Sequence, residues 1–237
     1  QIGRFINESH RLISMQMDYV FCYFRPDNKF PAHVFGGAAR NINNPKICSI
    51  DNFAYFHSSG GEGADADLPP AWCMDGVREE DLHDLRNFYE NQSGGLMLQC
   101  LHLSSERYDC SGVIAAFRQI GLKRERHLFA LRCRDALAAV ILVNVSDVGL
   151  NMSDLTNAVT IIVVDGQYLT QAIVRPVLRQ IDRFYETEEV PVLLYPRQAA
   201  AQMGIASEKS YSLWVYDTQN LDHYFRYLKR LLKFIQH

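Results

Sequence analysis

The order of apolar segments between Arg126 and Asp217 constrains the fold of this chain most strongly. Two of these segments read as buried strands on either side of one long helical pattern, which is typical of α/β proteins. Ligands bind at the carboxyl ends of such strands, so the same order also indicates where a site should lie. In chain order the predicted segments are the hairpin Arg126–Asp135 and Ala136–Ser146, the strand Asn157–Gly166, the helix Leu169–Glu188, and the strands Val190–Pro196 and Tyr211–Asp217.

The composition is that of an ordinary soluble globular protein. Of the 237 residues, 48% are hydrophobic and 22% are charged, and the formal net charge is −3. This charge gives no general attraction to nucleic acid or to anionic membranes, so we expect neither as a partner. No apolar run reaches the ~20 residues of a membrane helix and no signal peptide is recognisable, so we expect a cytoplasmic protein without membrane insertion. A start at Gln1 fits either a processed chain or a piece of a longer protein that carries other domains.

The cysteines and histidines give no sign of a metal site. Six cysteines are scattered without any CxxC pair, and the eight histidines are equally dispersed. Four of the cysteines lie inside apolar, strand-like runs, where a cysteine usually serves as a small buried hydrophobe. We therefore expect six free thiols and no metal cofactor.

The residues before the hairpin read as a separate α/β part. Polar and glycine-rich residues at Ser58–Pro70 predict an internal loop, and Gly36-Gly37 reads as a bulge or a point of close backbone packing. We place the domains at 1–104 and 105–237. The predicted strands are Asp18–Arg25, Ala32–Ala39, Ile47–His57 and Leu96–Leu103, and the predicted helices are Arg4–Met15, Arg78–Asn91 with Asp75 as its cap, and Cys110–Ile120.

The carboxyl-terminal residues predict an amphipathic helix. Its apolar side chains fall on one face at helical spacing, and lysines and arginines occupy the rest. A basic amphipathic helix can lie on a membrane, but packing of the apolar face on the parent sheet is the favoured interpretation. The apolar residues are Leu221, Tyr224, Phe225, Leu228, Leu231, Leu232 and Ile235.

From about Tyr108 to Asp217 the chain resembles the GNAT superfamily of N-acetyltransferases. The resemblance lies in the succession of a helix, an antiparallel hairpin, the strand NAVTIIVVDG, the helix LTQAIVRPVLRQIDRFY, the strand VPVLLYP, the helix RQAAAQMGI and the strand YSLWVYD. It implies an α/β fold with a mixed, mostly antiparallel sheet and flanking helices. The amino-terminal part, with HVFGGAAR and CSIDNFAYFH, resembles a preceding, partial GNAT-like half.

The resemblance also implies a binding site for acyl-CoA as co-substrate. In this superfamily the pyrophosphate lies on backbone N–H groups where a turn enters a helix, and such a turn suits an anion. The corresponding positions here are Val164, Gly166, Gln167, Tyr168, Leu169 and Thr170. Only one glycine of the usual signature is present, and Asp165 adds a negative charge. Pro176 predicts either a kink in the following helix or a separate first turn.

Asp165 and Tyr195 end the two central strands, where the resemblance implies groups that handle protons during catalysis. A strand-end or turn residue at Asp165 and a core tyrosine with a bonded hydroxyl at Tyr195 are the favoured interpretation of the same two positions. The sequence thus leaves two functions open. One is acyl transfer from acyl-CoA, or from an acyl carrier, to an amine acceptor. The other is a non-catalytic ligand-binding or regulatory module that retains a degenerate GNAT fold.

Overall fold

The computed structural model describes residues 17–59, 67–104, 110–147, 154–167, 169–187, 189–220 and 222–235. The chain divides into two compact units, which are described separately. Unit 1 comprises Gln1–Asp51, Tyr89–Leu101 and Tyr211–His237, and unit 2 comprises Asn52–Phe88 and His102–Ser210. Both units combine segments from either side of residue 104, and the boundary predicted there stays a prediction.

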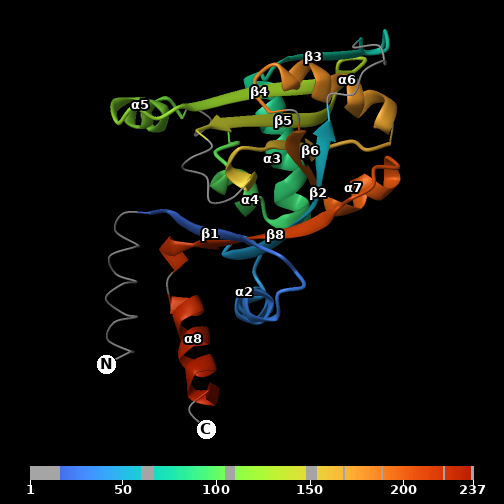
Figure 1. Ribbon diagram of the computed structural model, residues 1–237. Coiled ribbons are helices and arrows are strands. Elements are labelled where there is room, and N and C mark those ends of the chain that lie inside the picture. The colour runs from blue at the N-terminus through green and yellow to red at the C-terminus, as the bar shows by residue number, and fades with distance from the viewer. Residues whose placement is uncertain are drawn as a thin grey trace. The chain divides into compact units, whose positions relative to one another are not determined.

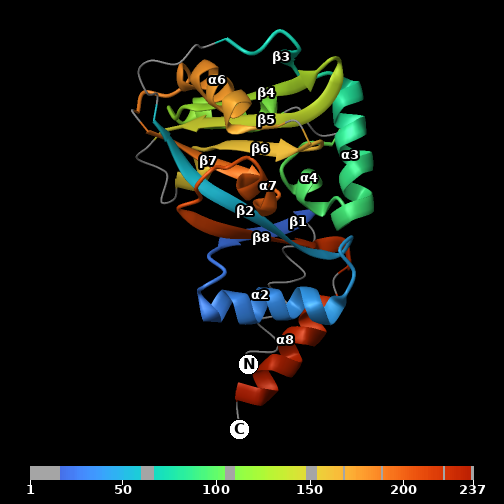
Figure 2. The same cartoon turned by 90° about the vertical axis from the view of Figure 1, so that its right-hand side faces the viewer.

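Unit 2 is built on a mixed sheet whose strands follow the order β2-β7-β6-β5-β4-β3. The pairs in this order are antiparallel except for β6 and β7, which run parallel. Figure 2 shows β3, β4, β5 and β6 one below another. The mixed, mostly antiparallel α/β fold predicted from the sequence is therefore confirmed. The strand bounds are β2 Cys48–Ser59, β3 Trp72–Gly76, β4 Arg124–Cys133, β5 Ala136–Ser146, β6 Val159–Val163 and β7 Glu189–Tyr195.

The core of unit 2 lies between this sheet and the helices α6 (Gln171–Asp182) and α7 (Arg197–Gln202). Side chains at every second position of the strands point to the same face, so valines, leucines and isoleucines two residues apart all reach the helices. On α6 the residues Ile173, Val174, Val177, Leu178 and Ile181 are buried against the sheet. Pro176 lies inside α6, which is one helix, so the separate first turn allowed by the sequence is not present. The buried strand residues are Ala139, Ile141, Val143 and Val145, then Val159, Ile161 and Val163, and then Val190, Val192 and Leu194.

The start of α3 (Glu79–Ser93) differs from the sequence prediction. Asp75 does not cap this helix, because it belongs to β3, a strand that the sequence did not reveal, and pairs with Ala130. Asp81 instead accepts a hydrogen bond from the backbone N–H of Arg78 at 2.7 Å. The same carboxylate forms a buried ion pair with Arg132 of β4. α5 (Ser111–Gln119) is a helix as predicted, and Figure 1 shows it beyond the start of β4.

Unit 1 pairs two strands from opposite ends of the chain. β1 (Tyr19–Phe24) runs antiparallel to β8 (Lys209–Asp217), with Tyr19 opposite Asp217. In Figure 1 the two strands lie side by side, β1 in blue and β8 in red. α2 (Lys29–Ile42) and α8 (Asp222–Ile235) contribute to the aromatic core of this unit.

Two predicted strands of the amino-terminal part are helices. The prediction for Ala32–Ala39 was wrong, because Asn28 caps α2 by accepting the Phe30 N–H and Asn43 ends it in a left-handed conformation. The glycine pair Gly36-Gly37 is thus helical and forms no strand bulge.

The prediction for Leu96–Leu103 was also wrong. Its first five residues form the short helix α4 (Leu96–Cys100). Four of these five residues are buried, so the run has no polar face, and periodicity cannot distinguish a short buried helix from a strand. Two 3₁₀ helices, Asp154–Thr156 and Thr218–Asn220, complete the described elements.

Other predictions fall on residues that are not described. The helix Arg4–Met15, most of the loop Ser58–Pro70, Tyr168 and Leu221 lie wholly or partly outside the described ranges. All six cysteines are described, and all are free thiols as predicted. None of the helices in the described part of the chain is both long enough and apolar enough to cross a membrane.

Candidate functional site

The parallel pair β6 and β7 ends at a definite point. Its last partners are Ile162 and Tyr195. β7 ends at Tyr195, whereas the chain of β6 stays bonded to β5 beyond this point, because the backbone N–H groups of Val164 and Asp165 both donate to the carbonyl oxygen of Ala138, at 2.8 and 3.1 Å. The ladder between the two parallel strands therefore stops at their carboxyl ends, which is where sheets of this kind bind ligands.

The turn from β6 into α6 satisfies several of its own backbone donors. The Asp165 side chain is exposed, and its Oδ1 accepts the backbone N–H of Gln167 at 2.9 Å. The N–H of Leu169 donates to the carbonyl of Gly166 at 3.2 Å. Thr170 is the residue before the helix and has extended backbone. Two of the N–H groups that the sequence assigned to a pyrophosphate are thus already bonded within the turn.

Gly166 is not required by crowding. A Cβ atom added there would lie 3.5 Å from both the Gln202 Oε1 and the Val163 Cγ1 atoms, which is ordinary van der Waals contact. The turn therefore has room for a side chain at this position. Space alone does not explain the glycine.

Tyr195 and Asp165 both lie at the carboxyl ends of the parallel strands, as the sequence predicted. Tyr195 is 6% exposed, and its ring centroid is 5.0 Å from that of Phe53 on β2. Asp165 is exposed, three residues beyond the end of the β6–β7 ladder. The two side chains thus differ sharply in their access to solvent, and their catalytic roles stay predictions.

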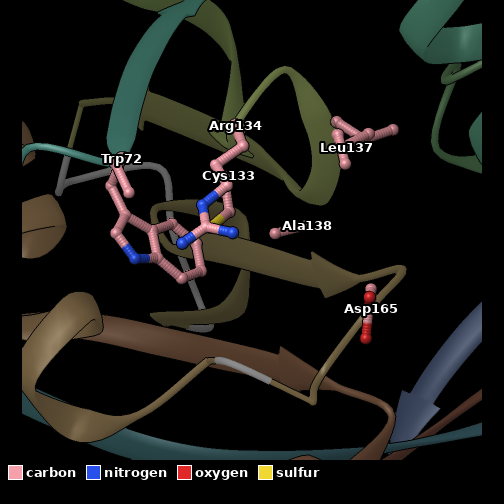
Figure 3. Close-up of a pocket in the computed structure, with 8 residues that line it drawn as sticks. Trp72, Cys133, Arg134, Leu137, Ala138 and Asp165 are labelled. Atoms are coloured by element: carbon pink, nitrogen blue, oxygen red, sulfur yellow. The ribbon is translucent and has the colours of Figure 1, made fainter.

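A cavity of about 540 Å³ opens beside Asp165. Its wall comes from the start of β3, the turn between β4 and β5, the start of β5, and the turn after β6. Figure 3 shows the Arg134 side chain extending towards the indole of Trp72, with Ala138 between this pair and Asp165 in that view. The lining residues are Ala71, Trp72, Cys133, Arg134, Ala136, Leu137, Ala138 and Asp165.

The turn between β4 and β5 has two residues in a backbone conformation that such residues rarely adopt. Arg134 and Asp135 have φ angles of 50° and 69°, which gives the two-residue turn type that normally contains Asn-Gly. The Arg134 N–H donates to the Ala71 carbonyl at 2.9 Å, so the turn is joined to the residue before β3. The hairpin itself was predicted, but Trp72 and Arg134 were missed as site residues. No short motif contains both, and the strand that carries Trp72 was not recognised.

A second polar cluster lies on β2. His57 bridges the hydroxyl of Tyr55, 3.0 Å from its Nε2, and the carboxylate of Glu208, 3.0 Å from its Nδ1. His57 is opposite Pro191, near the amino end of β7 and therefore away from the carboxyl ends described above. Tyr55 is only 1% exposed, so this cluster offers no phenol to a ligand.

Metal binding has no support from the described side chains. Among the residues that the structure describes, no group of three histidine, cysteine, aspartate or glutamate side chains is placed to hold a metal ion.

Comparisons with known proteins give likenesses of structure only. No family model and no curated protein sequence matches this chain. A Drosophila protein matches with 12% identity and a TM-score of 0.43, over 81% of this chain and 59% of that one. GCN5-related N-acetyltransferases from Sphaerobacter thermophilus and Kribbella flavida match with 10% and 7% identity and TM-scores of 0.38 and 0.42. They are matched over 84% and 91% of this chain, and over 60% and 75% of their own.

These likenesses are too distant to bear on activity. This chain spans about three fifths of the Drosophila protein. What supports the GNAT-like fold is the order of its own elements: helix, antiparallel hairpin, strand, helix, parallel strand, helix and final strand. This order of elements resembles that of the GNAT fold, as the sequence predicted, and the presence of a tandem half stays a prediction.

Proposed function

We propose that this protein transfers an acyl group from acyl-CoA, or from an acyl carrier, to an amine. The observation that carries the proposal is the parallel pair β6 and β7 within an otherwise antiparallel sheet, with a ladder that ends at Ile162 and Tyr195. We place an extended thioester arm at this end of the ladder, where its backbone-bonding groups would meet the last residues of the two strands. The turn that follows β6 and the start of α6 would then meet the phosphates.

The chemistry needs one group that accepts a proton and one that returns it. The acceptor ammonium first gives a proton to a base, for which Asp165 is the candidate. The amine nitrogen then attacks the thioester carbonyl, so that a C–N bond forms and the C–S bond breaks. The leaving thiolate takes up a proton, for which Tyr195 is the candidate donor, and the second proton that the nitrogen loses as the amide forms restores the tyrosine hydroxyl. In total one proton is released for each acyl group transferred.

A second function has its own support. The hydrogen bond between the Asp165 carboxylate and the Gln167 N–H occupies a donor that a pyrophosphate would use, and it places negative charge at the same turn. A protein of this fold that no longer catalyses acyl transfer would not be impaired by this hydrogen bond and negative charge. The second candidate is therefore a non-catalytic module that binds a ligand or regulates another protein.

Asp165→Asn separates these roles, because an asparagine Oδ1 still accepts the Gln167 N–H while the charge is lost. If Asp165 only opposes the phosphates, acetyl-CoA should bind more tightly to the variant, by roughly 1 kcal/mol for a partly screened charge. If Asp165 is the base, binding should change little and turnover should disappear. Calorimetry and the release of free CoA thiol measure the two quantities on the same samples.

Asp154→Asn is the matched control, since Asp154 is exposed in a 3₁₀ helix outside the site and the same charge is removed. A screen of acyl chain lengths by thermal unfolding should precede the variants. A ligand at a hundred times its Kd adds about 2.7 kcal/mol of stability, which such a screen detects easily. Absence of acyl-CoA binding by wild type and by both variants would exclude acyl transfer from CoA and favour the non-catalytic module.

A further inference from the structure

We infer that the cavity between Trp72, Arg134 and Asp165 is the acceptor subsite, and that its ligand is a free amino acid with an aromatic or large aliphatic side chain. In this arrangement Arg134 binds the carboxylate, Asp165 binds the ammonium group, and the indole of Trp72 packs on the apolar side chain. The binding follows from the cavity alone. The transfer of an acyl group to the bound amine rests on the proposed function.

The charges of the lining select the class of ligand. The cavity presents one cationic and one anionic side chain, Arg134 and Asp165, and both are exposed. Among the described residues no ion pair joins the two. A ligand with one charge would leave the opposite protein charge uncompensated, whereas a zwitterion neutralises both. The other lining residues are alanine, leucine, cysteine and tryptophan, which suit an apolar side chain.

A nucleotide fits this lining less well. Stacking on Trp72 and a phosphate on Arg134 would be favourable, but several phosphate charges would face a single guanidinium. Asp165 would lie in the same cavity and repel them. The proposed ligand is therefore an amino acid, and nucleotide binding is tested as the alternative.

The backbone at Arg134 supports a role for its side chain. A left-handed conformation costs an L-residue about 1–2 kcal/mol, and the hairpin turn has two such residues where Asn-Gly would avoid much of the cost. Strain of this kind is concentrated at functional sites. Here it places the Arg134 side chain in the lining of the cavity, with the turn joined to Ala71 by the Arg134 N–H.

The size of the cavity agrees with this class of ligand. Small-molecule sites commonly measure roughly 300–1,000 Å³, and the cavity here has about 540 Å³. Asp165 also stands at the end of β6, where the thioester is proposed to lie. An ammonium group held by this carboxylate would be next to its acyl donor and to its candidate base.

The first experiment compares three ligands that differ only in charge, with the complete chain and without CoA. Phenylalanine has both charges, 2-phenylethylamine lacks the carboxylate, and 3-phenylpropanoate lacks the amine. Calorimetry should show phenylalanine as the tightest, with a loss of about tenfold or more for each missing group. Equal affinity for phenylalanine and 2-phenylethylamine would overturn the role of Arg134.

The second experiment assigns the charges to the side chains. Arg134→Asn suits a left-handed turn and removes the charge, so it should weaken phenylalanine and leave 2-phenylethylamine unchanged. Asp165→Asn should weaken both amines and leave 3-phenylpropanoate unchanged. Trp72→Leu should weaken all three aromatic ligands relative to leucine. Arg118→Gln, an exposed change on α5, is the control and should alter none of them.

The outcomes also separate this inference from the proposed function. If phenylalanine binds as expected but no acyl-CoA binds or reacts, the subsite stands and acyl transfer from CoA fails. If acyl transfer to phenylalanine occurs and Arg134→Asn leaves its rate and KM unchanged, the function stands and the subsite is wrong. If Arg134→Asn weakens adenosine 3′,5′-bisphosphate and not phenylalanine, the cavity is a nucleotide site and the inference is overturned.

Discussion

The two units of this protein bury different kinds of side chain. The core of unit 2 between the sheet, α6 and α7 is mainly aliphatic, with valine, isoleucine, leucine and alanine and one buried aromatic side chain, Phe56. The core of unit 1 is largely aromatic and includes Phe24, Trp214, Tyr216 and Tyr227. Aliphatic side chains in a core need only to be buried and well packed, whereas buried tryptophan and tyrosine also need hydrogen-bond partners for their polar atoms.

Unit 1 provides those partners at specific places. The Trp214 Nε1–H donates to the Cys48 sulfur at 3.1 Å, and the Tyr216 hydroxyl donates to the Asn220 carbonyl at 2.7 Å. The Tyr227 hydroxyl donates to the His33 carbonyl of α2 at 3.2 Å. An aromatic core of this kind fixes which atoms must meet. It should therefore be less tolerant of small displacements than the aliphatic core of unit 2.

The largest expected effect concerns the one buried charge pair that interrupts the aliphatic character of unit 2 among the described residues. Asp81 and Arg132 have side-chain exposures of 8% and 3%, and they are joined by two hydrogen bonds. Asp81→Ala leaves the guanidinium buried without its main partner, which should cost about 3–5 kcal/mol. Chemical denaturation of wild type and variant measures the difference.

Two further variants test the cause of that loss. Asp84→Ala removes an exposed carboxylate from the same helix and should change stability by less than about 0.5 kcal/mol. Replacing both Asp81 and Arg132 by leucine should recover most of the loss, since a buried ion pair is often replaced by apolar residues without cost. A double variant as unstable as Asp81→Ala would show that this part of unit 2 depends on ionic contacts.

The next effect tests the tolerance of unit 1. A Cβ atom at Gly37 of α2 would lie 2.2 Å from the Tyr227 hydroxyl oxygen and 3.1 Å from its Cζ atom. Gly37→Ala should therefore destabilise the protein by about 1–3 kcal/mol through overpacking. Thermal unfolding measures the loss, and Gly36→Ala is the matched control, because its Cβ would meet only the end of the flexible Arg40 side chain at 3.3 Å.

A rescue experiment identifies the clash. Tyr227→Phe removes the oxygen that a Cβ at Gly37 would strike, although it also removes the hydrogen bond to His33. The double variant should lose less stability than the sum of the losses in the two single variants, which would indicate direct contact between the two positions. If the two stability losses add exactly, α2 must move as a whole to relieve the clash. The aromatic core would then tolerate displacement better than proposed.

The sequence predicted unit 2 better than unit 1 for the same physical reason that distinguishes their cores. Strands such as Val159–Val163 consist of β-branched residues bounded by turns, so a strand can be predicted there without knowledge of the neighbouring strands. α2 was misread because its aromatic residues resemble a strand and its caps, Asn28 and Asn43, were not weighed. α4 is too short and too uniformly buried to show a helical period.

The candidate site was predicted only in part. Asp165 and Tyr195 were found because strand ends can be located from an apolar run and the turn after it. The bond between Asp165 and the Gln167 N–H was not foreseen, because it depends on the conformation of the turn. Trp72 and Arg134 lie 62 positions apart, and only the pairing of β3 with β4 brings them to one cavity. Pairing between distant strands is not encoded in any local pattern.

The third prediction uses cysteines to compare the two units without changing stability. Burial raises the pKa of the Cys48 and Cys100 thiols of unit 1 to about 12. At pH 8 the reactive thiolate is therefore rare at both positions. The pKa of Cys73 of unit 2 is also raised, first by desolvation and then by Asp75, but this thiol is exposed, so iodoacetamide reaches it in the folded protein and should label it first. Mass spectrometry at timed intervals gives the order. Early labelling of Cys48 would show that the aromatic core opens before unit 2 does.

The smallest expected effect is a pH dependence at the polar cluster of unit 2. The pKa of Glu208 is lowered below its usual value of 4.5, first by the hydrogen bond from the His57 backbone N–H and then by the His57 ring. A carboxylate with a lowered folded-state pKa stabilises the protein fully above its unfolded pKa. This stabilisation is lost as the pH falls through the folded value. Wild type should therefore lose slightly more stability than Glu208→Gln between pH 5 and about pH 3, because the glutamine does not titrate. Identical acid limbs in denaturation curves of the two proteins would show that His57 and Glu208 meet too close to solvent to affect stability.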